Sequence, residues 1–145
     1  MDNDALSRGV CPVGRGLARV GDGWSMLVLR DVARGVQRFD ALQKGLGIAP
    51  NILTRRLAAL VEDGLLERRR YSERPPRHEY VLTAMGRDYL PVLHALGAWG
   101  ARHFGDDSVV RLVAADGHVV QPMVIDAVTG APLADMTLTV KTAAP

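Results

Sequence analysis

The feature that most constrains this chain is the segment NILTRRLAALVEDGLLERRRYSERPPRHEY at residues 51–80. Its apolar residues recur every three or four positions, at Leu53, Leu57, Leu60 and Val61. This spacing predicts a helix with one buried stripe, opened by Pro50 and ended by Gly64. The remaining side of the helix begins with polar and basic residues, namely Asn51, Thr54, Arg55 and, on its flank, Arg56.

Two short runs follow the predicted helix, LLERRRY and HEYVLT, with SERPPR between them. Their β-tolerant residues predict a two-stranded hairpin. Because proline fits poorly in a tight two-residue turn, a longer and stiff basic loop is expected between the strands. The arginines on and around the hairpin are Arg68, Arg69, Arg70, Arg74 and Arg77.

Helical patterns flank this segment on both sides. CPVGRGLARV, GWSMLVLRDVARG and RFDALQKGLG predict three helices before it, the first opened by Pro12 and the second closed by Gly35. TAMGRDYLPVLHALGAWGARHF predicts a long helix after it, kinked at Pro91. A short helix, a turn, a polar-faced helix and a hairpin form the winged helix-turn-helix layout, so the expected fold is mainly α with a small β wing.

In this layout the second helix of the pair enters the DNA major groove. Asn51, Thr54, Arg55 and Arg56 would then meet base edges and phosphates, and the hairpin arginines would follow the neighbouring phosphates. Charge alone does not separate this interpretation from a solvated surface, because nearby acidic residues can pair with the arginines. The order of the elements favours DNA. These acidic residues are Glu62, Asp63, Glu67, Glu73 and Glu79.

The charge of the chain is unevenly distributed along its 145 residues. The formal net charge is only +2, but residues 1–105 carry +5 and residues 106–145 carry −3. In the acidic part, AADGHVV and AVTGAPL contain turn signals and MTLTVK alternates apolar with polar residues, which predicts a short C-terminal β appendage of two or three strands. We therefore expect a DNA-binding and dimerisation domain at residues 1–104 and a β-rich extension at residues 105–145.

The order and spacing of four motifs resemble the HxlR-type transcriptional regulators, winged-helix relatives of the MarR group. The motifs are CPV at 11–13, GDGWSMLVLRDVARGVQRFDAL at 21–42, IAPNILTRRLAALVEDGLLER at 48–68 and HEYVLTAMGRDYLPVLHALGAWG at 78–100. The resemblance covers roughly residues 10–104. It implies a homodimeric regulator, with a repressor expected, that reads a pseudo-palindromic operator in double-stranded DNA. Dimerisation would use the N-terminal segment and residues 89–104.

The single cysteine, Cys11, precedes Pro12 and a predicted helix, with Arg8 and Arg15 close in sequence. Helix N-termini and cations favour the reactive thiolate form. The resemblance implies sensing of oxidants or electrophiles at this position, whereas an inert, packed cysteine is the plainer interpretation. The alternative effector is a noncovalent small molecule bound near the dimer helices, with walls from Trp24, Met26, Trp99, Phe104 and Met123.

Other chemistry finds little support in the residue pattern. The four histidines are scattered, no phosphate-loop motif occurs, and Cys11 has no triad partners, so we expect neither an enzyme nor a cofactor. The extension has no cysteine, so no metal is expected. Without a signal peptide or membrane span, a cytoplasmic location is expected. A winged helix used only for protein contacts is the least favoured alternative.

Overall fold

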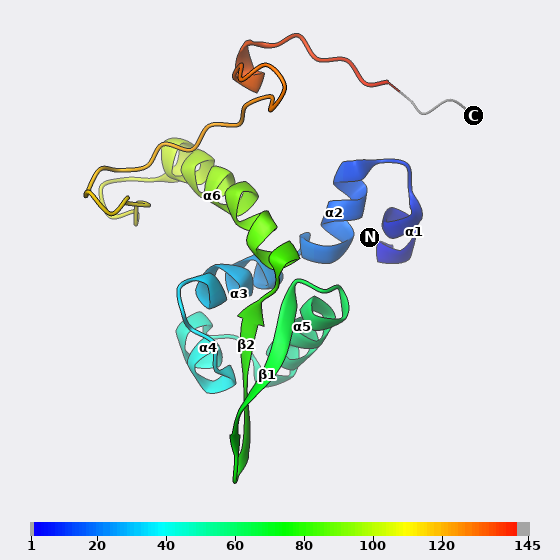
Figure 1. Cartoon of the computed structure of the whole chain (residues 1–145), viewed down its shortest axis with the longest axis vertical. Coiled ribbons are helices and arrows are strands. Elements are labelled where there is room, and N and C mark those ends of the chain that lie inside the picture. Colours follow the sequence, from blue (N-terminus) through cyan, green and yellow to red (C-terminus); the bar gives the residue numbers. More distant parts are fainter. Residues whose placement is uncertain (1, 142–145) are drawn as a thin grey trace. The chain divides into compact units, whose positions relative to one another are not determined.

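The computed structural model describes residues 2–141 and has the expected winged helix-turn-helix order (Figure 1). The helices are α1 (Asn3–Arg8), α2 (Pro12–Val20), α3 (Gly23–Ala33), α4 (Phe39–Leu46), α5 (Pro50–Glu62) and α6 (Ala84–Phe104). The strands are β1 (Leu66–Glu73) and β2 (Pro76–Leu82), and a short 3-10 helix, η1, spans Leu133–Asp135. The backbone divides into two compact units, residues 2–90 and residues 91–141 of the described chain.

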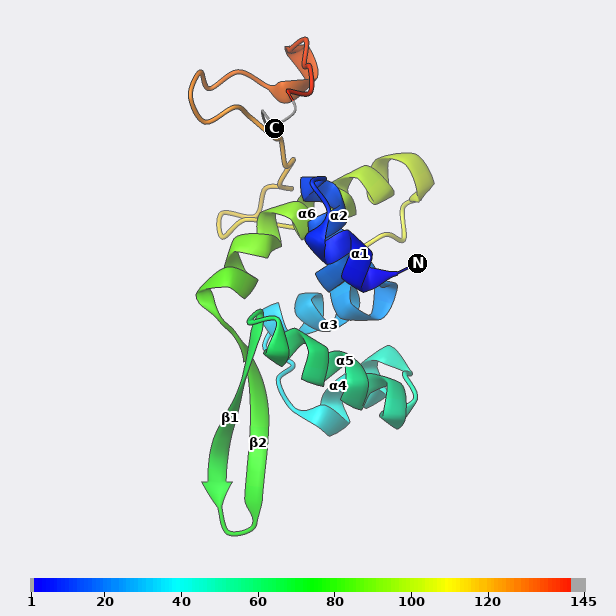
Figure 2. The same ribbon diagram turned by 90° about the vertical axis from the view of Figure 1, so that its right-hand side faces the viewer.

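The core of the first unit is built around the leucine stripe of α5. Leu53, Leu57 and Leu60 are almost completely buried and pack in one cluster with residues of α3 and α4. This confirms the predicted buried stripe. The other core residues are Val20, Val28, Leu29, Val32, Leu42, Ile48, Leu65 and Leu66. Figure 2 shows α3, α4 and α5 gathered at one end of the β1–β2 hairpin, whose far end projects away from them.

The turn between α4 and α5 is set by its own residues. Gly47 follows α4 with φ +64°, a left-handed conformation that glycine adopts without a Cβ clash. Ile48 is buried in the core, and Pro50 occupies the start of α5, where a missing N–H costs no helical hydrogen bond. The chain therefore leaves α4 and enters α5 within three residues, as a helix-turn-helix requires.

The hairpin, called the wing below, differs from its prediction at the tip. Glu73 pairs with Pro76, so the turn is the two residues Arg74 and Pro75, joined by a cis peptide bond. The expected longer loop is wrong, because the two strands stay paired as far as Glu73 and Pro76. The strand register shifts between Arg70 and Ser72, where β1 contains a bulge.

The N-terminal segment contains a helix that sequence reasoning missed. The Asp2 carboxylate accepts hydrogen bonds from the backbone N–H groups of Asp4 and Ala5, at 3.0 and 3.3 Å, and so caps α1. None of the residues of α1 is buried. Such a short helix has no apolar periodicity to reveal it, and the cap was its only signal.

The extension after α6 is less regular than predicted. Its two expected turns are present, with isolated antiparallel bridges between Val113 and Val119 and between Ile125 and Pro132. Residues 136–141, the expected strand MTLTVK, form no strand in the described chain. Alternation of apolar and polar residues makes a strand only when another strand pairs with it, and here none does.

The long C-terminal helix is confirmed as one continuous α6 that contains Pro91. Thr83 caps its start, because the hydroxyl oxygen accepts the Gly86 N–H at 3.1 Å and donates to the Gly64 carbonyl at 2.6 Å. The predicted kink at Pro91 stays a prediction, and so does the domain boundary at residue 104.

Gly86→Ala should destabilise the protein by about 1–3 kcal/mol, because the added Cβ would collide with the Leu65 carbonyl oxygen and approach Leu82 Cδ2 at 2.9 Å. Urea unfolding followed by circular dichroism measures the change. The matched control is Gly45→Ala in α4, where the new Cβ meets nothing within 4 Å. That control should stabilise the helix by up to about 1 kcal/mol. Equal effects of the two substitutions would contradict the packing at Gly86.

Candidate nucleic-acid interface

The first turns of α5 present an exposed polar surface. Asn51, Thr54 and Arg55 are exposed, while the neighbouring Leu53 and Leu57 are buried. The Arg55 side chain makes no hydrogen bond or ion pair with any other residue in the range 2–141. Its guanidinium group therefore keeps its donors available for a carboxylate, a phosphate or a guanine edge.

Arg56 has a different environment from its neighbour Arg55. Its Nε lies 3.2 Å from Oδ1 of Asp22, the residue that caps α3 by accepting the Ser25 N–H at 2.9 Å. The Arg56 Nε is buried and is not aligned for a hydrogen bond, so the contact with Asp22 is electrostatic. The structure thus places the Arg56 Nε between α5 and the start of α3, while 39% of the Arg56 side chain stays exposed.

A second ion pair joins α5 to the segment before α3. Arg19, near the end of α2, lies 3.3 Å from Asp63, the residue that ends α5. Both ion pairs are partly exposed, so each contributes little to stability by itself. Their positions matter more than their strength, because they connect α5 to α2 and α3 at two separate points.

The alternation of the strands divides the wing arginines between two faces. Arg68 pairs with Tyr80 and Arg70 with His78, on the face that also carries the buried Leu66. Arg69 lies on the opposite face, where it donates from Nε and Nη2 to Glu79 at 3.0 and 2.6 Å. The face of the wing shared with α5 is therefore basic.

Ion pairing inside the wing involves only part of the arginine set. Besides the Arg69–Glu79 pair, Arg70 contacts Glu73 at 3.1 Å. Arg74 and Arg77, at and beside the tip, are exposed and have no ion pair with another described residue. The acidic residues thus neutralise Arg69 and Arg70, and the tip stays basic through Arg74 and Arg77.

His78 adds no charge to this face near neutral pH. Burial lowers the pKa of His78, and the Arg68 and Arg70 guanidinium groups lower it further, against an opposing effect of Glu73. Arg68 Nη2 lies 3.3 Å from His78 Nδ1, a distance at which a neutral ring nitrogen accepts a hydrogen bond. The histidine therefore helps to orient Arg68.

The wing is attached to the helices by contacts that sequence reasoning missed. The Tyr80 N–H donates to the Gln37 carbonyl at 2.8 Å, and the Arg38 guanidinium lies 4.6 Å from the centre of the Tyr71 ring. No local pattern predicts such pairs, because their partners are more than thirty positions apart. They position the wing relative to α4, the first helix of the helix-turn-helix pair.

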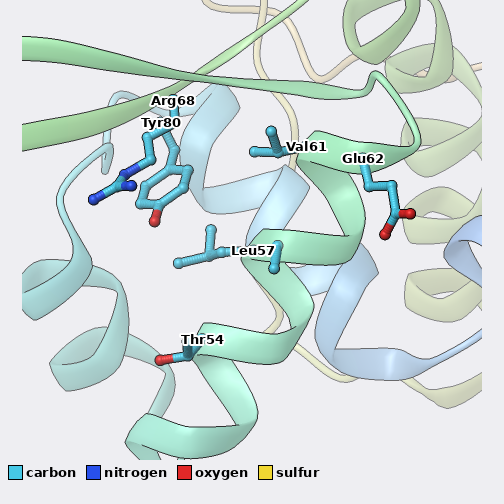
Figure 3. A pocket seen from close by; sticks show the side chains of 7 residues that line it. Thr54, Leu57, Val61, Glu62, Arg68 and Tyr80 are labelled. Carbon is cyan, nitrogen blue, oxygen red and sulfur yellow. The ribbon is translucent and has the colours of Figure 1, made fainter.

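A hollow of about 460 Å³ lies between α5 and the wing (Figure 3). We call it the α5–wing hollow. Its lining is mostly apolar, with α5 forming one wall and the strands the other. The lining residues are Thr54, Leu57, Ala58, Val61, Glu62, Arg68 and Tyr80. Sequence reasoning placed Thr54 and Arg68 on the interface but did not place them beside a common hollow.

Cys11 lies at the helix terminus where it was expected. It is exposed and caps α2, with its Sγ accepting the Gly14 N–H at 3.5 Å. The two neighbouring arginines bind other groups: Arg8 pairs with Asp4 at 3.6 Å, and Arg15 donates to the Gly9 carbonyl at 2.7 Å. The thiol is therefore accessible, but neither arginine contacts it.

The five residues predicted to wall an effector pocket take several positions. Trp24 and Met26 belong to α3, and Trp24 packs against the core of the first unit. Trp99 and Phe104 of α6 are exposed and form an edge-to-face pair with ring centres 5.2 Å apart. Met123 lies exposed in the extension. None of the five lines the α5–wing hollow, and a shared pocket stays a prediction.

In residues 2–141 no group of three histidine, cysteine, aspartate or glutamate side chains is arranged to hold a metal ion. None of the helices in that range is long and apolar enough to cross a membrane.

The fold and the exposed face of α5 define a winged helix-turn-helix protein. Residues 19–108 match the family described as HxlR-like helix-turn-helix, and the chain belongs to that family. An HTH-type transcriptional regulator of Mycobacterium tuberculosis is 48% identical over 88 residues, which are 61% of this chain and 56% of that protein. The chain thus matches little more than half the length of this relative. The family is one of helix-turn-helix regulators and not a class of enzymes.

Solved structures resemble the chain over different lengths. PA1607, described as a candidate transcription factor, is 40% identical with a TM-score of 0.83, covering 94% of this chain and 99% of that one. HypR in its oxidised form, described as a redox regulator, is 31% identical with a TM-score of 0.60, covering 64% of this chain and 97% of that one. The similarity to PA1607 includes residues of the extension, because residues 1–104 are less than 94% of the chain.

If Arg56 braces α5 against α3, its substitution should act through Asp22. In a double-mutant cycle of Arg56→Ala and Asp22→Ala, unfolding in urea should reveal a coupling of about 0.2–1 kcal/mol. Arg55→Ala is the matched control and should change the free energy of unfolding by less than about 0.5 kcal/mol. If the two substitutions change the free energy of unfolding additively, the ion pair does not hold α5 against α3.

Proposed function

We propose that the protein is a sequence-specific, double-stranded DNA-binding regulator of transcription, acting in the cytoplasm as a homodimeric repressor. The observation that carries this proposal is the exposed polar start of α5, with Asn51, Thr54 and Arg55, beside a wing with a basic face and tip. Family membership and relatives named as HTH-type transcriptional regulators support the same conclusion.

In the proposed complex, α5 lies in the major groove, where each base pair displays its own pattern of donors, acceptors and methyl groups. Arg55 suits the O6 and N7 acceptors of guanine, and Asn51 suits the N6 and N7 of adenine. Arg74 and Arg77 at the wing tip would bind phosphates, which fix position but carry no sequence information. Arg56 would act indirectly, by holding α5 against α3.

A homodimer is supported by an apolar stripe on α6. Val92, Leu96 and Trp99 recur at helical spacing and remain about half exposed in the single chain. A second copy covering this stripe would remove it from water, which is favourable in proportion to the apolar area buried. Two copies related by a two-fold axis would read half-sites about 34–36 Å apart in a pseudo-palindromic operator.

We further propose that Cys11 makes DNA binding sensitive to oxidants or electrophiles. Its exposure and its position at the start of α2 support this proposal, and so does the similarity to HypR, described as a redox regulator. An electrophile would alkylate the thiolate. An oxidant would take two electrons and two protons from Cys11 thiols of the two copies and join them in a disulfide.

Arg55→Ala should weaken binding to the preferred DNA sequence by about 1–3 kcal/mol, because a base contact is lost. Fluorescence anisotropy on a duplex selected from a random library measures the affinity. Arg77→Ala should instead weaken binding to all sequences and lower the salt slope by about 1, as expected for a lost phosphate contact.

A titration at duplex concentrations well above Kd also gives the stoichiometry, and the homodimer requires two chains per duplex. Wild-type affinity in Arg55→Ala would remove Arg55 from the base-reading set. If the wild-type protein binds all DNA sequences equally well, the proposed function itself is overturned.

Treatment with diamide or a quinone should release the wild-type protein from DNA and leave Cys11→Ser bound, because serine forms neither the disulfide nor the thioether. The same anisotropy assay measures both, and mass spectrometry reports the modification. Release of both proteins, or of neither, would contradict a sensor at Cys11. Under either result, a noncovalent ligand becomes the leading effector.

A further inference from the structure

The hydroxyl group of Thr54 is occupied within its own helix. Thr54 is exposed in the second turn of α5, and its Oγ1 donates a hydrogen bond to the Pro50 carbonyl oxygen at 2.9 Å. A threonine hydroxyl has a single hydrogen to donate. Once that hydrogen is held by Pro50, Thr54 can no longer donate without breaking a bond, and it offers another molecule only the acceptor lone pairs of Oγ1 and the Cγ2 methyl group.

The surface next to Thr54 is also apolar. Ala58 is exposed one turn further along α5, and Leu57 and Val61 continue the same wall of the α5–wing hollow. Figure 3 shows Thr54, Leu57 and Val61 along α5, with Arg68 and Tyr80 approaching from the strands. The outer face of this recognition helix is therefore polar at Asn51 and Arg55 but lined with methyl groups at Thr54 and Ala58.

One base feature of the major groove matches such a surface. Thymine carries a C5-methyl group there beside its O4 acceptor, and the other three bases carry no methyl group. Alanine and the threonine methyl are suitable contacts for the thymine methyl group. A hydrogen-bonding edge placed against Ala58 would lose its water without gaining a partner, which is costly. The apolar part of α5 therefore selects for thymine by attraction and against the other edges by desolvation.

We propose that Thr54 and Ala58 read the C5-methyl group of a thymine in each half-site of the operator. This inference rests on the proposed DNA-binding function and deepens it, because it assigns a base and a chemical group to named residues. It also assigns Thr54 a nonpolar role, although its residue type suggests a hydrogen-bonding one. The preferred sequence then contains an A·T pair at a fixed position in both halves.

The test compares thymine with uracil, which differs only in lacking the methyl group. The full-length protein first selects its preferred duplex from a random library. Each thymine of that duplex is then replaced singly by deoxyuridine, and Kd is measured by anisotropy at one salt concentration. One thymine per half-site should show about 4-fold weaker binding when replaced, the value expected for one buried methyl group.

Two variants of similar size separate the methyl group from the hydroxyl group. Thr54→Ser removes Cγ2 and keeps the hydrogen bond to Pro50, so the difference between thymine and uracil at that position should shrink to the part that Ala58 contributes. Thr54→Val keeps the methyl group and removes the hydroxyl, so the 4-fold difference should remain. Because Thr54 is exposed, both variants should fold, and circular dichroism checks this.

The outcomes distinguish failure of this inference from failure of the proposed DNA-binding function. If the protein prefers no DNA sequence, the proposed function fails and the inference fails with it. If the protein binds a defined sequence but tolerates uracil at every thymine, the inference alone is overturned. It is also overturned if Thr54→Ser retains the full uracil effect, because the Cγ2 methyl group would then read nothing. The same holds if Thr54→Val loses binding that Thr54→Ser keeps, because the hydroxyl would then be the reading group.

Discussion

The burial of one face of α5 is the constraint on which the rest of the structure depends. Leu53, Leu57 and Leu60 are almost inaccessible to water, and burial of each contributes about 1.5–3 kcal/mol relative to an exposed side chain. Rotating α5 about its axis would expose this stripe, so the helix has a single stable orientation. That orientation decides which residues face outward, and Asn51, Thr54 and Arg55 are among them. The candidate interface is thus a consequence of the core.

Contacts weaker than the core also fix the positions of α5 and the wing. The ion pairs of Arg56 with Asp22 and of Arg19 with Asp63 join α5 to α2 and α3, and the Tyr80–Gln37 hydrogen bond joins the wing to the loop before α4. Because they are partly exposed, the ion pairs add little stability. They connect the Cys11-bearing N-terminal segment to the recognition helix, so a change at α2 has a physical route to α5.

Prediction from sequence succeeded where a pattern is local and failed where it depends on distant partners. The α5 stripe, the glycine ends and the order of elements from α2 to α6 were correct, because helix periodicity and turn chemistry act over a few residues. The predicted length of the wing turn was wrong, because the point where two strands stop pairing depends on contacts between them. The strand expected at residues 136–141 was wrong because strands need pairing partners.

The sequence by itself determined the fold class, the recognition helix and the residues of its outer surface, because each follows from apolar spacing and from residues that start or end helices. Only the tertiary structure decided what each polar side chain does. Arg55 and Arg56 are identical in type and adjacent, yet one is exposed and the other meets Asp22. Thr54 is a polar residue whose hydroxyl is held by Pro50. Such distinctions depend on which groups the folded chain brings within a few ångströms, and residue type alone does not determine that.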